Sequence, residues 1–441
     1  MKKLCIWSST LLLTLFSNIS SAQNTSSVAV EDLTAEMAVS FNQRIIEYAI
    51  AEDRLLTLKG VRSAAIMHCA MHDALNAIHP KYTHYAYGKK APGANPVVAA
   101  AQAGYEIAVS QYPDHKQEFM EELNRWLTAA SEGASKMEGI RLGKEAAAAI
   151  LNARSDDRWD GEAEYVWHPM GPGVYAEFNE HSGTPEGFVF GAGWAVAKPF
   201  LLTKPDHFRS PPPPDIKSQD YTEAFNEVRE YGRTESKSRT ADQAHLAMWW
   251  KDFAESSHNR LTREIVIAEN LDLWEATRVF ALMNMSIYDA YVCVFENKFH
   301  YNHWRPYTAI RWAEHDGNPS TTQELDWNNL HLHTYAFPSY PSAHGTSSSA
   351  AMTILANTLG LGDDYAFTMT AEEVDKAGPF SEKIRMNPPT RSFSSFSEAT
   401  FECAMSRLYL GIHFRYDSEE GNKLGTQIGE YASANFLKPL E

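Results

Sequence analysis

Three short segments in the C-terminal half carry basic residues and histidines at spacings that suit binding of a tetrahedral oxyanion. The first segment contains Lys298 and then Arg305, which is followed directly by Pro306. The planar guanidinium of an arginine matches two oxygens of an oxyanion, and the ammonium of a lysine adds a point charge. Such a pair could equally be a solvated surface pair, so this segment alone is weak evidence for a site.

The second segment, Pro341-Ser342-Ala343-His344-Gly345, leads into a stretch of small residues that predicts a helix. A serine hydroxyl and the free N–H groups at a helix N-terminus together form an anion site. A histidine at this position could donate or accept a proton beside the anion. The alternative is that the serine is only the N-cap of the helix.

The third segment contains Arg407 and His413, which are too far apart in sequence to share one face of a straight helix. Gly411 between them predicts that the helix ends there and that the turn brings the histidine back toward the arginine. Asp417 could accept a hydrogen bond from one ring nitrogen of His413 and make the other nitrogen more basic. A buried structural histidine is the alternative.

Together the segments form the pattern Lys-x6-Arg-Pro, Pro-Ser-x-His and Ser-Arg-x5-His-x3-Asp. This pattern resembles the superfamily that contains vanadium-dependent haloperoxidases, type-2 phosphatidic-acid phosphatases and bacterial acid phosphatases. One position differs, because the family usually has glycine where this chain has Ala343. The backbone N–H of this residue can still bind an oxyanion, but its methyl group could crowd the anion or the substrate.

The resemblance implies a vanadate cofactor and a role for each matching residue. The groups implied to hold the vanadate oxygens are Lys298, Arg305, Ser342, the Ala343 amide and Arg407. His413 would coordinate vanadium, and His344 would be the acid–base partner of hydrogen peroxide. Lys298 would polarise the oxidant for attack by a halide. Phe295 and Phe337 correspond to residues that flank the halide site in the family, although plain core packing explains them equally well.

Three functions fit these residues. The first is a vanadate-dependent haloperoxidase that oxidises a halide, iodide or bromide, with hydrogen peroxide to hypohalous acid. The second is an acid phosphatase in which His413 attacks phosphorus and His344 protonates the leaving oxygen. The third is a non-catalytic oxyanion-binding protein. Small organic acceptors and a homo-oligomer are compatible with the sequence, and aromatic residues between the bundles could line a substrate entrance or a subunit contact.

The rest of the sequence predicts the helices that must position these segments. Apolar residues recur at helical spacing over 35–53, 61–78, 97–111, 114–132, 137–153, 221–231, 241–250, 257–269, 271–295, 343–359, 395–412 and 419–436. Residues 154–218 are rich in glycine, proline and aromatic residues and predict a long irregular connection. We therefore expect an all-α fold with a first bundle at 23–153 and a second bundle at 219–441 that carries the site.

An internal repeat suggests that the two bundles are related. Arg62 and Arg278 begin similar apolar segments, and an Asp-Ala pair follows each at the same distance, at Asp73 and Asp289. The first copy lacks the later Arg-Pro pair, so we expect chemistry only in the second bundle. Chance similarity between two amphipathic helices is the alternative.

The N-terminus and the net charge indicate where the protein acts and exclude some partners. Residues 1–22 combine two lysines, a short apolar run and small residues before a cleavage point, which predicts a signal peptide and export to the periplasm or the medium. The apolar run is too short to span a bilayer, and we expect no membrane insertion elsewhere. The net charge of −17 argues against nucleic acid as a partner.

Overall fold

The computed structural model describes residues 34–54 and 57–440, and the expected signal peptide at 1–22 lies outside these residues. The first part of the chain forms α1 (Glu36–Asp53), α2 (Leu58–Ile78), α3 (Pro96–Gln111), α4 (Lys116–Ala129) and α5 (Ala134–Ala153). The second part forms α7 (Gln219–Tyr231), α8 (Ala241–Trp249), α9 (Ala254–Ala268), α10 (Leu273–Tyr301), α11 (Pro306–Arg311), α12 (Ala343–Thr358), α13 (Phe396–Tyr409) and α14 (Arg415–Asn435). The expected all-α architecture is confirmed.

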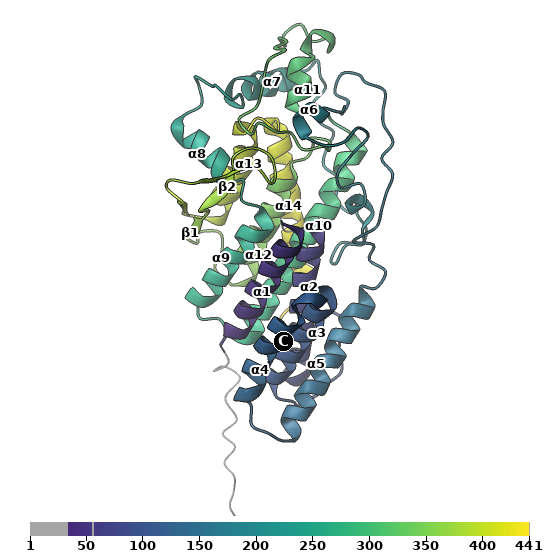
Figure 1. Cartoon of the computed structure of the whole chain (residues 1–441), viewed down its shortest axis with the longest axis vertical. Coiled ribbons are helices and arrows are strands. Elements are labelled where there is room, and N and C mark those ends of the chain that lie inside the picture. The colour runs from purple at the N-terminus through teal and green to yellow at the C-terminus, as the bar shows by residue number, and fades with distance from the viewer. Residues whose placement is uncertain (1–33, 55–56, 441) are drawn as a thin grey trace, which may run out of the picture.

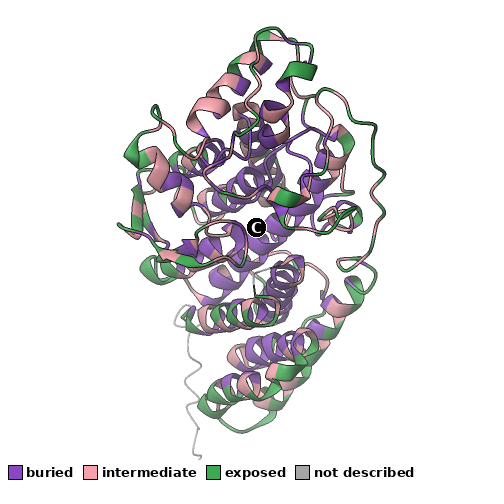
Figure 2. Ribbon diagram, turned by 45° about the horizontal axis from the view of Figure 1, so that its top comes forward, coloured by how far each residue is buried: buried purple, intermediate pink, exposed green. Residues whose placement is uncertain are grey.

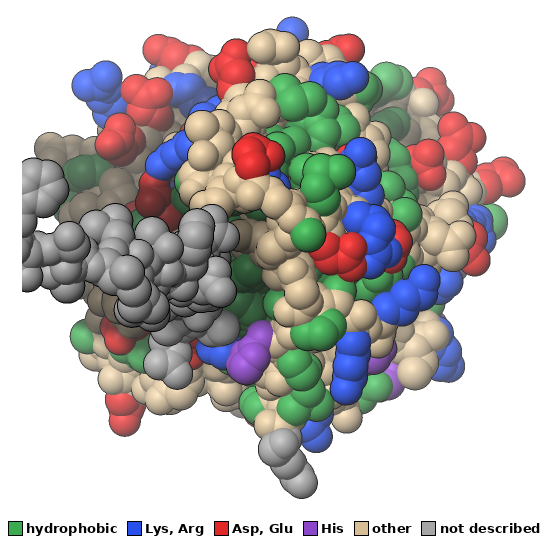
Figure 3. Space-filling model, turned by 90° about the horizontal axis from the view of Figure 1, so that it is seen from below, with side chains coloured by type: hydrophobic (Ala, Val, Ile, Leu, Met, Phe, Trp, Pro, Cys, Tyr) green, Lys and Arg blue, Asp and Glu red, His purple; other side chains and the backbone are tan. Residues whose placement is uncertain are grey.

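Helices α3, α4 and α5 lie at one end of the long axis and α7 and α11 at the other, with α10, α12 and α14 between them (Figure 1). Buried residues gather on these central helices, and exposed residues lie on the periphery (Figure 2). On the end of the molecule shown in Figure 3, basic side chains are interspersed with acidic ones, as on an ordinary solvated surface.

The central helix is α10, which packs against α2, α12 and α14. It begins at a capping box, in which Asp272 accepts from the N–H of Glu275 and Glu275 accepts from the N–H of Asp272. It continues past the expected end at Phe295 and stops at Tyr301, because Asn302 adopts the left-handed conformation with φ +50°. This extension places the last turn of α10 beside the site.

By length and composition, α10 could cross a membrane, a property that the sequence analysis did not assign to this segment. Within the fold, however, 94% of its apolar window is buried against the rest of the chain. The core helix of a compact domain has this burial, since its side chains face protein on every side.

The two copies of the repeat use their aspartates in the same way. Asp73 in α2 accepts hydrogen bonds from the backbone N–H groups of residues 85–87 at 2.7 to 2.8 Å. Asp289 in α10 accepts from those of residues 200–202 at 2.6 to 2.8 Å. Each buried carboxylate therefore anchors an incoming loop through three successive amides, which fits an origin of α2 and α10 from related bundles.

Residues 154–218 contain only a short helix, α6 (Asn179–Ser182), and a 3-10 turn at Trp194–Val196. The segment runs along the side of the molecule from α5 to α7, and its 3-10 turn packs on α10 (Figure 1). It thereby brings aromatic side chains against the helix that carries Lys298.

Two short antiparallel pairs follow α12, and the sequence analysis did not predict them. Strand β1 (Phe367–Thr370) pairs with β4 (Thr390–Phe393), and β2 (Glu373–Asp375) pairs with β3 (Lys383–Arg385). Strands of three or four residues contain too few alternating apolar and polar positions to be recognised from one sequence.

Candidate active site

The structure brings the three basic segments together around the end of α10. Lys298 lies in the last turn of α10, and Arg305 lies directly before α11. Ser342 caps α12, so that the following two residues begin the helix. Arg407 lies in the last turn of α13, and His413 lies in the turn that leads into α14. The left-handed φ of +79° at Gly411 makes this turn possible.

The hydrogen bonds of His413 determine which of its ring nitrogens carries the proton. Its Nε2 lies 3.1 Å from a guanidinium nitrogen of Arg305, and its Nδ1 lies 2.9 Å from Oδ2 of Asp417. A guanidinium can only donate, so Nε2 is the acceptor and Nδ1–H donates to the carboxylate. Burial, followed by the charges of Arg305 and Lys298, lowers the pKa of His413 well below its ordinary value. The ring is therefore neutral, with its Nε2 lone pair on the side of the cations.

Asp417 is fully buried and fixes the orientation of the His413 ring by accepting a hydrogen bond from its Nδ1 atom. Its Oδ2 also accepts from the N–H of Phe414 at 3.0 Å and from the hydroxyl of Ser339. Burial raises the pKa of the Asp417 carboxyl to about 6, against the effects of the Ser339 hydrogen bond and the charge of Lys298. Ser339 was not among the predicted site residues. Its position in the proline-rich segment before Ser342 was the only signal for it.

Lys298 is fully buried, and its ammonium contacts the loop before α12. It donates to the carbonyls of Pro338 at 3.0 Å, Ser339 at 2.7 Å and Pro341 at 2.5 Å. An ammonium has three N–H groups, so this loop engages all of them. Burial, followed by the charge of Arg305, lowers the pKa of Lys298 well below its ordinary value. Here Lys298 fixes the loop, and its direct contact with vanadate stays a prediction.

Three buried nitrogen atoms around His413 have no hydrogen-bond partner within the described residues: Nη2 of Arg305, Nε of Arg407 and Nε2 of His344. Other nitrogens of the two guanidiniums donate to backbone carbonyls. Arg305 donates to Phe337 and Ile412 at 2.9 Å, and Arg407 donates to Trp250 at 3.2 Å. Buried polar groups are nearly always paired, so these nitrogens fit the oxygens of a bound oxyanion.

The same residues do not form an ordinary cation site. Across the described residues, no group of three or more His, Cys, Asp and Glu side chains could hold a metal ion. The donor set around His413 is cationic or neutral, which suits an anionic cofactor such as vanadate.

At the start of α12, Ser342 is fully buried, and its hydroxyl accepts from the N–H of Gly345 at 3.4 Å. The N-cap alternative is therefore seen in the structure, and an oxyanion contact of this hydroxyl stays a prediction. The backbone N–H of Ser342 donates to the carbonyl of Asp417 at 2.8 Å, which joins α12 to α14. Ala343 lines the adjoining cavity, so its methyl group stands where the family usually has none.

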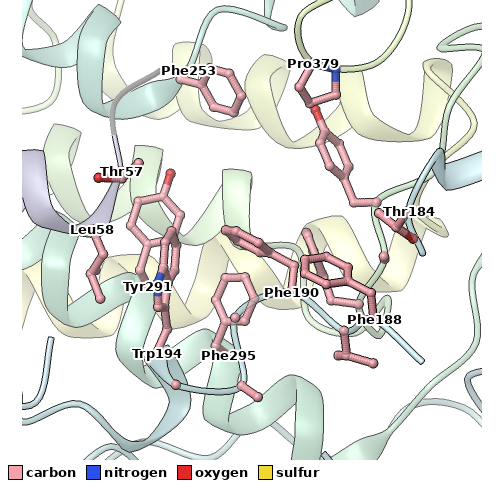
Figure 4. A pocket seen from close by; sticks show the side chains of 18 of the residues that line it. Thr57, Leu58, Thr184, Phe188, Phe190, Trp194, Phe253, Tyr291, Phe295 and Pro379 are labelled. Carbon is pink, nitrogen blue, oxygen red and sulfur yellow. The ribbon is translucent and has the colours of Figure 1, made fainter. Parts of the chain in front are cut away.

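Part of the predicted anion site lines a cavity of about 1060 Å³. His344, Arg407 and His413 line this cavity together with Phe295 and Phe337, whose ring centroids lie 5.1 Å apart. The two phenylalanines thus lie beside the proposed oxyanion position. Figure 4 shows Phe295 among other aromatic side chains that border the open space.

The comparisons with known proteins agree with this geometry. Residues 278–441 match the family model for the VCPO second helical-bundle domain. Vanadium chloroperoxidase from Curvularia inaequalis is 25% identical over 175 residues, which is 32% of this chain and 28% of that protein. The C-terminal part of the chain is therefore similar to the second helical-bundle domain of vanadium chloroperoxidases.

Two solved structures share the fold of this chain over most of its length. A bacterial vanadium-dependent iodoperoxidase aligns with a TM-score of 0.74 and 20% identity, over 93% of this chain and 99% of that chain. A holo-type bacterial vanadium-dependent chloroperoxidase aligns with a TM-score of 0.65 and 16% identity, over 85% and 90%.

We expect Asp417→Asn to weaken vanadate binding about 10- to 100-fold, because the uncharged amide orients and polarises the His413 ring less well. Equilibrium dialysis against orthovanadate measures the change. Asp364→Asn is a matched control, because Asp364 is exposed in the loop after α12. An affinity within twofold of wild type would show that Asp417 does not support the anion site.

Proposed function

We propose that this protein is a vanadate-dependent haloperoxidase that oxidises iodide or bromide with hydrogen peroxide to hypohalous acid. The observation that carries the proposal is the pair of buried, unpaired guanidinium donors on Arg305 and Arg407, together with the unpaired Nε2 of His344, around the Nε2 atom of His413. The similarity of residues 278–441 to the VCPO second helical-bundle domain supports vanadate as the oxyanion. When bound, vanadate supplies a Lewis acid that activates hydrogen peroxide toward a halide.

The chain itself contributes charge and a ligand nitrogen to this chemistry. Arg305 and Arg407 each offer an N–H donor to the anion, and a charge-assisted hydrogen bond contributes about 1.5–3 kcal/mol. Lys298 lies in the same cluster, with its nitrogen 5.3 Å from the centroid of the Phe337 ring. His413 presents its Nε2 lone pair, because Asp417 holds the proton on Nδ1. The two arginines would therefore neutralise a multiply charged oxyanion, and the oriented ring of His413 would bind it as a ligand.

His344 is suited to accept a proton from hydrogen peroxide. Burial, followed by the charge of Arg407, lowers the pKa of His344 well below its ordinary value, so the ring is neutral at pH 7. Its Nε2 has no partner in the described part of the chain, and the residue lines the cavity. Positioned acid–base help of this kind contributes about 10²- to 10⁴-fold in rate.

The aromatic surroundings favour a large halide. Phe295 and Phe337 give the site apolar walls, and the Arg305 guanidinium lies 4.7 Å from the centroid of the Phe337 ring. Removing an ion from water costs less as its radius grows, because the charging energy falls with radius. Iodide and bromide therefore enter such a pocket at lower cost than chloride.

The test is a pair of assays on the same preparation. The metal-free protein is incubated with orthovanadate, and oxidation of iodide and of bromide by hydrogen peroxide is followed in parallel with hydrolysis of p-nitrophenyl phosphate. We expect halide oxidation that saturates with vanadate. Its absence would overturn the proposal, and phosphate-ester hydrolysis that vanadate blocks would instead assign the site to an acid phosphatase. Vanadate binding without either activity would indicate an oxyanion-binding protein.

A further inference from the structure

A second cavity lies in the first bundle, apart from the three basic segments. It encloses about 400 Å³ between α2, α3, the end of α5 and the start of the irregular connection. We call it the arginine cavity, because Arg62, Arg154 and Arg158 line it. Pockets that enclose organic ligands typically have about 300–1000 Å³, so this space suits a small molecule.

The charges around the arginine cavity do not cancel. Its walls carry two carboxylates, from Asp157 and Asp160, and four cationic groups, from Lys59 and the three arginines. Lys59 forms an ion pair with Glu52, which still leaves three guanidinium groups against two carboxylates. This positive excess occurs in a chain whose net charge is −17, so it is not part of a generally basic surface. A ligand with one negative charge would neutralise it.

Arg62 has free donors that can hold such a ligand. The residue is 5% exposed, and its Nε donates to Oδ2 of Asp157 at 2.6 Å. Its Nη1 donates to Oε1 of Gln111 at 2.9 Å, and its Nη2 donates to the carbonyl of Arg154 at 3.0 Å. A guanidinium has five N–H groups, so two of those on Arg62 have no partner in the described part of the chain. Arginine donors suit a carboxylate, because their planar fork matches its two oxygens.

The carboxylate of Asp157 is shared between two buried arginines. Its Oδ2 also accepts from Nε of Arg154 at 3.0 Å, and both of these residues are 2% exposed. Arg154 further donates to the carbonyls of Pro199 at 2.7 Å and Lys198 at 2.6 Å, which fixes it in the cavity wall. One carboxylate therefore serves two guanidinium groups. A buried charge without its own counter-ion is costly, so a second carboxylate at Arg62 is favourable.

Arg278, the counterpart of Arg62 in the internal repeat, is used differently. It donates to the carbonyls of Leu437 at 2.7 Å and Thr358 at 3.0 Å, and its guanidinium lies 4.8 Å from the centroid of the Tyr82 ring. It forms no ion pair with a residue that the structure describes, and it does not line the arginine cavity. Arg278 thus joins segments of the fold, whereas Arg62 also faces a cavity that a ligand can enter.

One wall of the arginine cavity is apolar. Leu151 and the half-buried Trp159 supply it, and the Arg62 guanidinium lies 5.7 Å from the centroid of the Trp159 ring. An aromatic ring that packs on this indole can therefore direct a carboxylate attached to it toward Arg62. Trp159 also lines the larger cavity that contains His344, so the two cavities share this side chain.

We propose that the arginine cavity binds a small aromatic monocarboxylate, with its carboxylate at Arg62 and Arg158 and its ring on Trp159. A monocarboxylate is favoured over a phosphate, because a second negative charge would face Asp157 and Asp160 without a cation to balance it. The site is independent of the proposed function, since no residue predicted to hold vanadate lines it.

Calorimetry on the whole protein without vanadate compares three probes. Benzoate carries the proposed carboxylate and ring, benzamide has the same shape without charge, and acetate lacks the ring. We expect benzoate to bind about tenfold more tightly than benzamide, as one charge-assisted hydrogen bond allows. It should also bind about tenfold more tightly than acetate, because only benzoate can pack on Trp159. Benzamide or acetate binding as tightly as benzoate would overturn the proposal.

Substitutions of single arginines locate the bound benzoate. Arg62→Gln should weaken benzoate about tenfold and leave benzamide unchanged. Arg125→Gln is the matched control, because Arg125 is exposed on α4 and does not line the cavity. Arg407→Gln is titrated in parallel, since a carboxylate could also enter the predicted vanadate site, and it should keep the wild-type affinity. Loss of benzoate in Arg407→Gln but not in Arg62→Gln would place the probe at that other site and overturn the proposal.

Two exposed residues of the cavity test the charge argument without altering the buried network of Arg62. Arg158→Gln removes a cation and should weaken benzoate about twofold, whereas Asp160→Asn removes an anion and should strengthen it about twofold. The effects are small because water screens both side chains. Opposite changes would support the site even if Arg62→Gln failed to fold, and equal affinities of the two variants would overturn it.

Discussion

Replacing His413 by alanine is expected to abolish vanadate-dependent halide oxidation. The ring is 4% exposed, and its two nitrogens are engaged by Arg305 and Asp417, so no neighbouring side chain can take the position of Nε2. Changes in residues that only support a metal ligand cost about 10- to 100-fold, and loss of the ligand itself should exceed this. The folded state should persist, because α14 keeps its cap through Asp417 and the backbone N–H of Phe414.

Iodide oxidation measured across a titration of orthovanadate checks this result, with thermal unfolding as the measure of fold. His300→Ala is the matched control, because His300 is exposed in the last turn of α10 and should leave activity unchanged. Activity of His413→Ala near the wild-type level would show that the ligand assignment is wrong.

His344→Ala should lower kcat about 10²- to 10⁴-fold while the protein still binds vanadate. The reason is that Arg305, Arg407 and His413 hold the anion, whereas His344 moves the proton. Since burial first and then Arg407 lower the pKa of His344, the neutral ring is the form that accepts the proton. Activity is therefore present above this pKa and is lost as the pH falls through it.

Two measurements distinguish this role from a structural one. The pH profile of kcat/KM should have an acid limb in wild type that disappears in His344→Ala. The dissociation constant for vanadate should change less in His344→Ala than in His413→Ala. If both variants lost vanadate equally, His344 would be a binding residue, and the acid–base assignment would fail.

The amino-acid sequence by itself determined the features of the site that depend on spacing within one segment. Arg407, Gly411, His413 and Asp417 lie within one helix end, one turn and one helix start, so local backbone preferences decide their arrangement. Helical spacing of apolar residues likewise predicted most helices. It missed the end of α10, because Asn302 ends that helix through a left-handed conformation that apolar spacing does not encode.

Only the tertiary structure decided the contacts between segments. It directed the Lys298 ammonium to the carbonyls of Pro338, Ser339 and Pro341, where the sequence had suggested a free donor to the anion. It also placed Glu255 against Tyr291, although neither lies in a recognisable motif.

The irregular connection at residues 154–218 is a second case in which the sequence did not predict contacts between segments. Its composition predicted an aromatic-rich segment, but the packing of its 3-10 turn on α10 decided that Trp194 lines the cavity beside Phe295. The physical reason is that these contacts depend on burial. A carboxylate, an ammonium or an indole takes a specific partner only when neighbouring elements exclude water from it, and no single segment can do that before the helices pack.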